Sequence, residues 1–225
     1  MARSVQLSQL RDWVRKRADI ENVTGRFPDA ELNDYINQSI ARLYTILDRA
    51  DDSYYQSLYT VTTTSGSNTY ALPADFWVCK GINVVVSSNV RFRARRYMPD
   101  EGPWLTSQGV WASGFPVWYR EKGNNIVFAP VPTGSYGIEI EYSQAPPRLV
   151  NDSDTFDGRA GFEEFVVLDS AIKVRRKQRV DCSELTMDLA KIEDWVTSLA
   201  GRDNAAPERI QDVQQMDNYR YPWGL

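Results

Sequence analysis

Hydrophobic residues recur at helical spacing near the beginning of the chain. Leu7, Leu10 and Val14 lie three and four positions apart and predict a helix over residues 4–20. A second helix is predicted to begin at Pro28, because proline suits the first turn and the acidic residues that follow lie near the positive end of the helix dipole. Its apolar face continues as far as Leu47, and the polar residues 51–53 are expected to end it.

The same spacing returns in the last third of the chain. Residues 162–180 begin apolar and end basic, an order that suits the helix dipole. A last helix is expected to have Asp181 or Ser183 as its N-cap and Gly201 at its C-cap. Its hydrophobic residues stand at heptad spacing: Leu185, Leu189, Ile192, Val196 and Leu199.

Between the helical halves, the pattern changes to that of β-strands. Short runs rich in β-branched and aromatic residues alternate with turn residues, which predicts strands over residues 58–64, 69–72, 82–86, 90–97 and 137–143. Residues 117–121 and 125–129 are predicted to form a hairpin around Lys122, Gly123 and Asn124. Such strands indicate a small antiparallel sheet or sandwich.

The predicted fold is therefore α+β. We expect an antiparallel helical bundle of about four helices, with an inserted antiparallel β domain and an extended C-terminal tail. The predicted parts are residues 1–58 and 150–202 for the two halves of the helical body, residues 59–149 for the inserted domain and residues 203–225 for the tail.

The overall composition fits an ordinary globular protein. The 225 residues include 26 basic and 30 acidic side chains, and the net charge of −4 argues against a protein that coats nucleic acid. Residues 1–6 become polar where a signal peptide needs an apolar run, and no apolar stretch approaches the about 18 residues of a membrane span, so neither is predicted. Cys79 and Cys182 lie far apart, which favours a reducing compartment without a disulfide framework.

The chain contains no histidine. This excludes Ser-His-Asp and Cys-His catalysis and histidine metal sites, and it removes the commonest general acid or base at neutral pH. Catalysis by carboxylates alone stays open. We predict no enzyme activity, no catalytic or metal-binding residue and no cofactor.

Acidic residues cluster after the predicted β domain. Residues 152–157 resemble a calcium loop, with Glu163 at the twelfth position, but Phe156 stands at a ligand position and Asp157 stands where the loop needs glycine. A solvated acidic turn before a helix is the favoured interpretation. The pairs Asp51/Asp52, Asp152/Asp154 and Glu163/Glu164 lie in loops or helix starts, where acids are common without catalysis.

The strand at residues 90–97 has an unusual charge pattern. Val90, Phe92 and Ala94 alternate with basic residues, so the basic side chains share one strand face. That face can contact phosphates or carboxylates, and a solvated edge strand protected by charge is the alternative. The basic residues are Arg91, Arg93 and Arg95.

The last residues differ from the polar segment before them. From residue 202 the chain is polar and aperiodic, and it then ends in large apolar side chains with little rotamer entropy to lose. Such residues are typical anchors in the pocket of a partner, and folding back onto the same chain is the alternative. The predicted anchors are Tyr219, Tyr221, Pro222, Trp223 and Leu225.

This order of elements resembles the head-to-tail adaptor proteins of tailed bacteriophages, also called connector or head-completion proteins. The similarity covers about residues 4–200. It includes the Leu-Pro stretch at residues 70–76, the Pro-x-Pro stretch at residues 129–132, and Tyr142. These stretches shape strands and turns rather than a reaction site.

The resemblance implies a structural protein of the virion neck, made in the host cytoplasm. It implies a homo-oligomeric ring, usually of twelve copies, that lies under the portal protein, extends the DNA channel and provides the platform for a tail, tail-tube or nozzle protein. The C-terminal tail would bind the portal and give Tyr219, Tyr221 and Trp223 their pocket. Arg91, Arg93 and Arg95 would contact either the passing DNA, without sequence specificity, or a neighbouring subunit. No membrane partner is implied.

Two other function classes remain open at this point. A carboxylate-dependent cell-wall hydrolase of the virion predicts a cleft with two acids at glycosidase separation. A DNA-binding accessory protein that uses the arginine strand predicts salt-dependent retention of DNA by the monomer, which the negative net charge disfavours.

Overall fold

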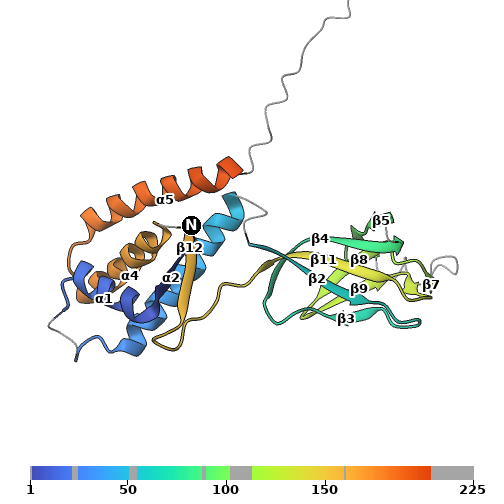
Figure 1. The fold of residues 1–225 in the computed structure, drawn as a ribbon, viewed down its shortest axis with the longest axis horizontal. Helices are drawn as coiled ribbons and strands as arrows, with labels where there is room; N and C mark the ends of the chain where they lie inside the picture. The colour runs from blue at the N-terminus through green and yellow to red at the C-terminus, as the bar shows by residue number, and fades with distance from the viewer. Residues whose placement is uncertain are drawn as a thin grey trace, which may run out of the picture.

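The computed structural model of the protein describes residues 2–21, 25–50, 55–87, 90–101, 113–159 and 161–203. Helices lie at one end of the molecule and a β sandwich lies at the other (Figure 1). The fold is α+β, as predicted. Within the described residues the helices are α1 (Leu7–Arg17), α2 (Asp29–Ala50), α4 (Phe162–Gln178) and α5 (Ser183–Asp203).

The four helices surround one hydrophobic core. Helix α4 is buried on all sides from Phe165 to Ile172, and it contacts α1, α2 and α5. It therefore occupies the centre of the helical end. The core is built from Leu10 and Val14 of α1, Ile36 and Ile40 of α2, Phe165 and Leu168 of α4, and Leu189 and Val196 of α5.

Two short strands complete the helical end and correct the sequence prediction. β1 (Ala2–Gln6) pairs antiparallel with β12 (Thr155–Arg159), and Val5 lies opposite Phe156. Both of these side chains are buried in the helical core. The first helix therefore begins at Leu7 rather than residue 4, and the second strand overlaps residues 152–157, where an acidic turn was predicted.

The β sandwich consists of two four-stranded sheets. The first sheet has the order β2 (Gln56–Thr62), β11 (Gly137–Gln144), β4 (Phe76–Ser87) and β5 (Val90–Arg93). The second sheet has the order β3 (Thr69–Ala71), β9 (Asn125–Ala129), β8 (Trp118–Lys122) and β6 (Arg95–Arg96). Ile82, Ile138 and Ile140 of the first sheet share a core with Ile126 and Phe128 of the second.

The predicted hairpin at residues 117–129 is confirmed, since β8 and β9 pair antiparallel across the turn at residues 123–124. Gly123 has φ of +59°, a left-handed conformation that glycine adopts without strain. The pairing is not antiparallel throughout, however. β6 runs parallel to β8, and β7 (Ser113–Gly114) runs parallel to β10 (Val131–Pro132).

The end of the last helix also differs from the prediction. Helix α5 continues to Asp203, so Gly201 lies inside the helix and is not its C-cap. The helix begins at Ser183, whose backbone N–H (3.0 Å) and hydroxyl (2.8 Å) donate hydrogen bonds to the carboxylate of Asp181. Residues 51–53, which were expected to end the second helix, lie outside the described residues.

Side-chain contacts join the helical end to the sandwich. Asp48 of α2 lies 2.9 Å from the ammonium group of Lys80 in β4, and it accepts a hydrogen bond of 2.6 Å from the hydroxyl of Ser143 in β11. Trp77 of β4 packs against the helical core, and the rings of Tyr44 and Tyr55 stack with centroids 3.9 Å apart. The direction in which the sandwich projects is thus set by specific contacts.

Candidate functional site: the outer faces of the sandwich

The outer face of the first sheet carries two of the three predicted arginines. Arg91 of β5 donates hydrogen bonds from Nε (2.7 Å) and Nη2 (2.9 Å) to the two carboxylate oxygens of Glu139 in β11. This bidentate contact crosses β4, which lies between the two strands. The contact lowers the pKa of Glu139 and raises the pKa of Arg91, because each charge stabilises the other.

Arg93 lies two residues further along β5, on the same face of the sheet. Its guanidinium donates to Glu141 (2.8 Å) and to the backbone carbonyl of Lys80 (2.9 Å). The side chain lies directly over Gly81, where an added Cβ would be 1.6 Å from Nη2. Any other residue at this position of β4 would therefore displace the guanidinium.

Arg95, the third predicted arginine, lies in the other sheet. The backbone N–H of Ala94 donates to Ile82 in the first sheet (2.9 Å), whereas the next N–H, of Arg95, donates to Val117 beside the second sheet (2.9 Å). Arg95 is in register with Trp118 of β8 and so shares the outer face of the second sheet. Alternation alone placed the three arginines together, but the chain changes sheets between residues 94 and 95.

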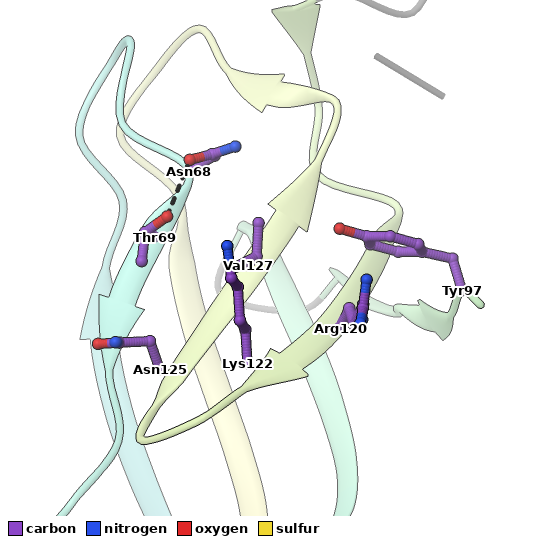
Figure 2. Close-up of a pocket in the computed structure, with 7 residues that line it drawn as sticks. All are labelled: Asn68, Thr69, Tyr97, Arg120, Lys122, Asn125 and Val127. Carbon is purple, nitrogen blue, oxygen red and sulfur yellow. Dashed lines mark hydrogen bonds between the residues drawn. The ribbon is translucent and has the colours of Figure 1, made fainter. Parts of the chain in front are cut away.

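A shallow hollow of about 490 Å³ lies on the outer face of the second sheet. Figure 2 shows its side chains, which come from β3, β8 and β9 and from residues 68 and 97. Two of them are cations, Arg120 and Lys122, and none is a carboxylate. The remaining lining residues are Asn68, Thr69, Tyr97, Asn125 and Val127.

The polar groups of the hollow include several hydrogen-bond donors. The hydroxyl of Thr69 donates to the side-chain carbonyl of Asn68 at 3.0 Å, which leaves the Asn68 amide N–H₂ as a donor. Tyr97 is largely buried, and its burial raises the pKa of its phenol, against the opposing effect of the Arg120 charge. The hollow therefore offers positive charge and N–H or O–H groups.

The chain was compared with known protein families. Residues 5–172 match the model of the family described as SU10 adaptor protein. The chain belongs to the SU10 adaptor family. No curated protein matches the chain. The match begins at β1, contains α1, α2 and the whole sandwich, and ends within α4.

Membership of the SU10 adaptor family confirms the resemblance drawn from the sequence. The family consists of adaptors, so this adaptor is a structural component of a bacteriophage particle, and it interacts with other structural proteins of the phage. Among the residues that the structure describes, none of the helices has the length and hydrophobicity to span a membrane.

The acidic residues of the adaptor's sequence motifs have structural partners. Asp152 pairs with Arg11 of α1. Asp154 accepts hydrogen bonds from the backbone N–H groups of Val150 (2.7 Å) and Asn151 (2.8 Å), which lowers its pKa. The described part of the chain holds no group of three Cys, Asp or Glu side chains placed for a metal ion.

The acidic pair Glu163 and Glu164 at the start of α4 also has partners within the chain. Glu163 accepts a hydrogen bond from the backbone N–H of Gly161 (2.8 Å), at the start of α4, and Glu164 lies 3.8 Å from Arg17. Asp51 and Asp52 lie outside the described residues.

Both cysteines, Cys79 and Cys182, are free thiols.

The predicted C-terminal anchors of the adaptor, residues 219–225, lie outside the described residues, so their contacts stay a prediction. Sequence reasoning did not single out the hollow. The alternation of Arg120 and Lys122 along a predicted strand was a usable signal for two of its residues. Asn68 and Tyr97 come from distant segments, and no local pattern connects them to the strand.

Proposed function

We propose that the protein is a head-to-tail adaptor that forms a ring beneath the portal, extends the DNA channel and provides the platform to which the tail attaches. The observation that carries this proposal is the family match over residues 5–172, which includes the β sandwich and most of the helical end. The ring is proposed to be dodecameric and to occupy the virion neck after synthesis in the host cytoplasm. A closed ring is the ordinary outcome when identical subunits meet through one repeated interface.

The two ends of the molecule suit two different neighbours. We assign the helical body to residues 1–58 and 150–202, as an antiparallel bundle, and the displayed β domain to residues 59–149. The contacts of Asp48 with Lys80 and Ser143 support a fixed angle between the two parts. A fixed angle is useful in a ring, because each copy then presents the same surface to the tail.

The arginines are proposed to act through symmetry. A ring repeats each side chain around the channel, so a few cations per copy produce a positive belt for DNA that passes without sequence-specific contact. For Arg95 we favour a contact with a neighbouring subunit over one with the DNA, because it lies on the same sheet face as Trp118 of β8, whereas Arg91 and Arg93 already pair with glutamates. No cofactor and no catalytic step enter this function.

The C-terminal residues 203–225 are proposed to bind the portal, with Tyr219, Tyr221 and Trp223 as anchors and Pro222 and Leu225 beside them. Large aromatic side chains in partner pockets contribute most of the binding energy in many interfaces. Truncation after Asp203 is the sharpest test, because it removes the tail and leaves α5 complete. We expect binding to portal rings to fall by at least about tenfold, or ~1.4 kcal/mol.

A matched variant separates the anchors from the length of the tail. Tyr219→Ala/Trp223→Ala in the full chain should reproduce most of the loss, whereas Gln214→Ala/Gln215→Ala should bind portal rings as the unaltered protein does. Undiminished binding after truncation would remove the tail from the mechanism. A truncated chain with an unchanged thermal transition shows that the body still folds.

A further inference from the structure

The cations of the sandwich fall into two groups. Those near an acidic residue of the same chain are paired with it, as Arg91 is with Glu139, Arg93 with Glu141, and Arg96 with Glu121 at 3.7 Å. Arg95, Arg120 and Lys122 share the outer face of the second sheet. They make no ion pair with any residue that the structure describes.

We propose that this face, with the hollow formed by Arg120 and Lys122, binds a carboxylate-rich polypeptide segment of a partner protein. The proposal rests on the adaptor function, because an adaptor must present a contact surface to another structural protein, and it names the chemistry of that contact. Carboxylates accept hydrogen bonds from guanidinium and ammonium groups at short distance, and these bonds are stronger than neutral ones.

The composition of the hollow favours a carboxylate over a neutral ligand. Its charged groups are all positive, and Asn68, Thr69 and Tyr97 add amide and hydroxyl groups around them (Figure 2). The Asn68 carbonyl accepts the hydrogen bond of the Thr69 hydroxyl, and the Asn68 amide N–H₂ adds two donor hydrogens. Asn125 adds a group that both donates and accepts, which suits the backbone of a peptide as well as its side chains.

The same observations favour a polypeptide over nucleic acid. A protein that binds the DNA backbone by itself neutralises many phosphates at once, about 6–10 in tight complexes. Here the face offers three cations, and the whole chain has a net charge of −4, which repels a polyanion. A hollow of about 490 Å³ can enclose side chains of a short segment, whereas a continuous duplex would lie across its rim.

The test uses the full chain and a fluorescently labelled oligoglutamate peptide as the probe. Fluorescence anisotropy should detect binding that weakens as salt is raised, because charges near the surface are screened. Arg120→Gln/Lys122→Gln should weaken this binding about tenfold. Arg120→Lys, which keeps the charge and loses the planar group, should have a smaller effect.

A charge-matched control removes two cations elsewhere on the surface. The side chains of Arg148 and Lys191 are 76% and 77% exposed, so Arg148→Gln/Lys191→Gln should change peptide binding less than about twofold. Circular dichroism of each variant checks that the fold is kept.

Three outcomes would overturn the inference. These are equal binding by the Arg120/Lys122 variant and the control, the absence of oligoglutamate binding at low salt, and tighter binding of a short DNA duplex through the same two residues. The portal assay with the truncated tail does not involve this face. The inference and the adaptor function can therefore fail independently.

Discussion

The two outer faces of the sandwich have similar ingredients and different chemistry. Both carry basic residues at alternate strand positions. On the first sheet, β11 places Glu139 and Glu141 within reach, and each arginine is neutralised inside the chain. On the second sheet, Arg120 and Lys122 line a hollow without a carboxylate. The difference shows that a row of cations indicates a binding surface only when the neighbouring strands supply no acids.

The helical end gives the extreme case of internal pairing. Asp169 of α4 is 7% exposed, and it lies 2.7 Å from Arg42 of α2 and 2.9 Å from Lys173. Burial raises the pKa of Asp169, but the hydrogen bonds and charges of Lys173, Ser39 and Arg42 outweigh it and lower the pKa overall. Among the ion pairs of the described residues, this one has the most buried carboxylate.

The largest expected effect is that of Asp169→Asn. It leaves Arg42 and Lys173 without their shared anion and should lower the free energy of unfolding by about 2–3 kcal/mol, measured by urea denaturation. Because the folded pKa of Asp169 is lowered, its contribution is full above the unfolded pKa of about 3.9 and is lost as the pH falls through the folded value. If a variant of an exposed ion pair on the first sheet lowered the free energy of unfolding by as much, burial would not explain the difference between the pairs.

The next effect is that of Gly81→Ala on the first sheet. The new Cβ would occupy the position of the Arg93 guanidinium, so the arginine must move away from Glu141. The guanidinium is the end of a flexible side chain, and we expect a loss of about 1 kcal/mol in the free energy of unfolding. The double variant Gly81→Ala/Arg93→Ala should lose less than the sum of the two single changes. Full additivity would show that Arg93 does not lie over Gly81.

A smaller effect is expected for Arg93→Gln, since its side chain is 53% exposed. Water screens an exposed pair, so the loss should be about 0.2–1 kcal/mol. A double-mutant cycle with Glu141→Gln measures the coupling directly. A coupling energy of zero between Arg93 and Glu141 would mean that the arginines of the first sheet are as free to bind a partner as the cations of the second sheet.

The smallest effect is expected for Arg120→Gln and Lys122→Gln. These side chains make no ion pair within the described residues, so the free energy of unfolding should change by less than about 0.5 kcal/mol. A clear loss of stability would show that the two cations serve the fold rather than a partner. Together with the Arg93 cycle, this measurement sharpens the contrast between the two faces.

Local patterns in the sequence predicted much of the fold. Pro28 and the acidic residues after it marked the start of α2, and the turn at residues 123–124 marked the β8–β9 hairpin. The pairing of β1 with β12 escaped prediction, because it joins two five-residue strands about 150 positions apart, in which Val5 and Phe156 form a buried pair. Helical spacing at Leu7 and Leu10 then extended the first helix too far.

The site was harder to predict than the fold, for the same physical reason. Whether an arginine is paired depends on the strand beside it, and Glu139 is 48 positions from Arg91. The change of sheet between Ala94 and Arg95 depends on the distant partners Ile82 and Val117. Alternation fixes the side of a strand on which a residue lies, and tertiary pairing fixes what it meets there.

The most direct experiment is electron microscopy of the protein bound to its portal ring. We expect a ring of copies with the helical bodies beneath the portal, aromatic C-terminal residues in portal pockets, and the second-sheet face of the sandwich against acidic residues of a neighbouring protein. The first-sheet face, with Arg91 and Arg93 paired to glutamates, should remain uncovered. Copies that form no ring on the portal, or a ring in which the first-sheet face makes the contact, would contradict this expectation.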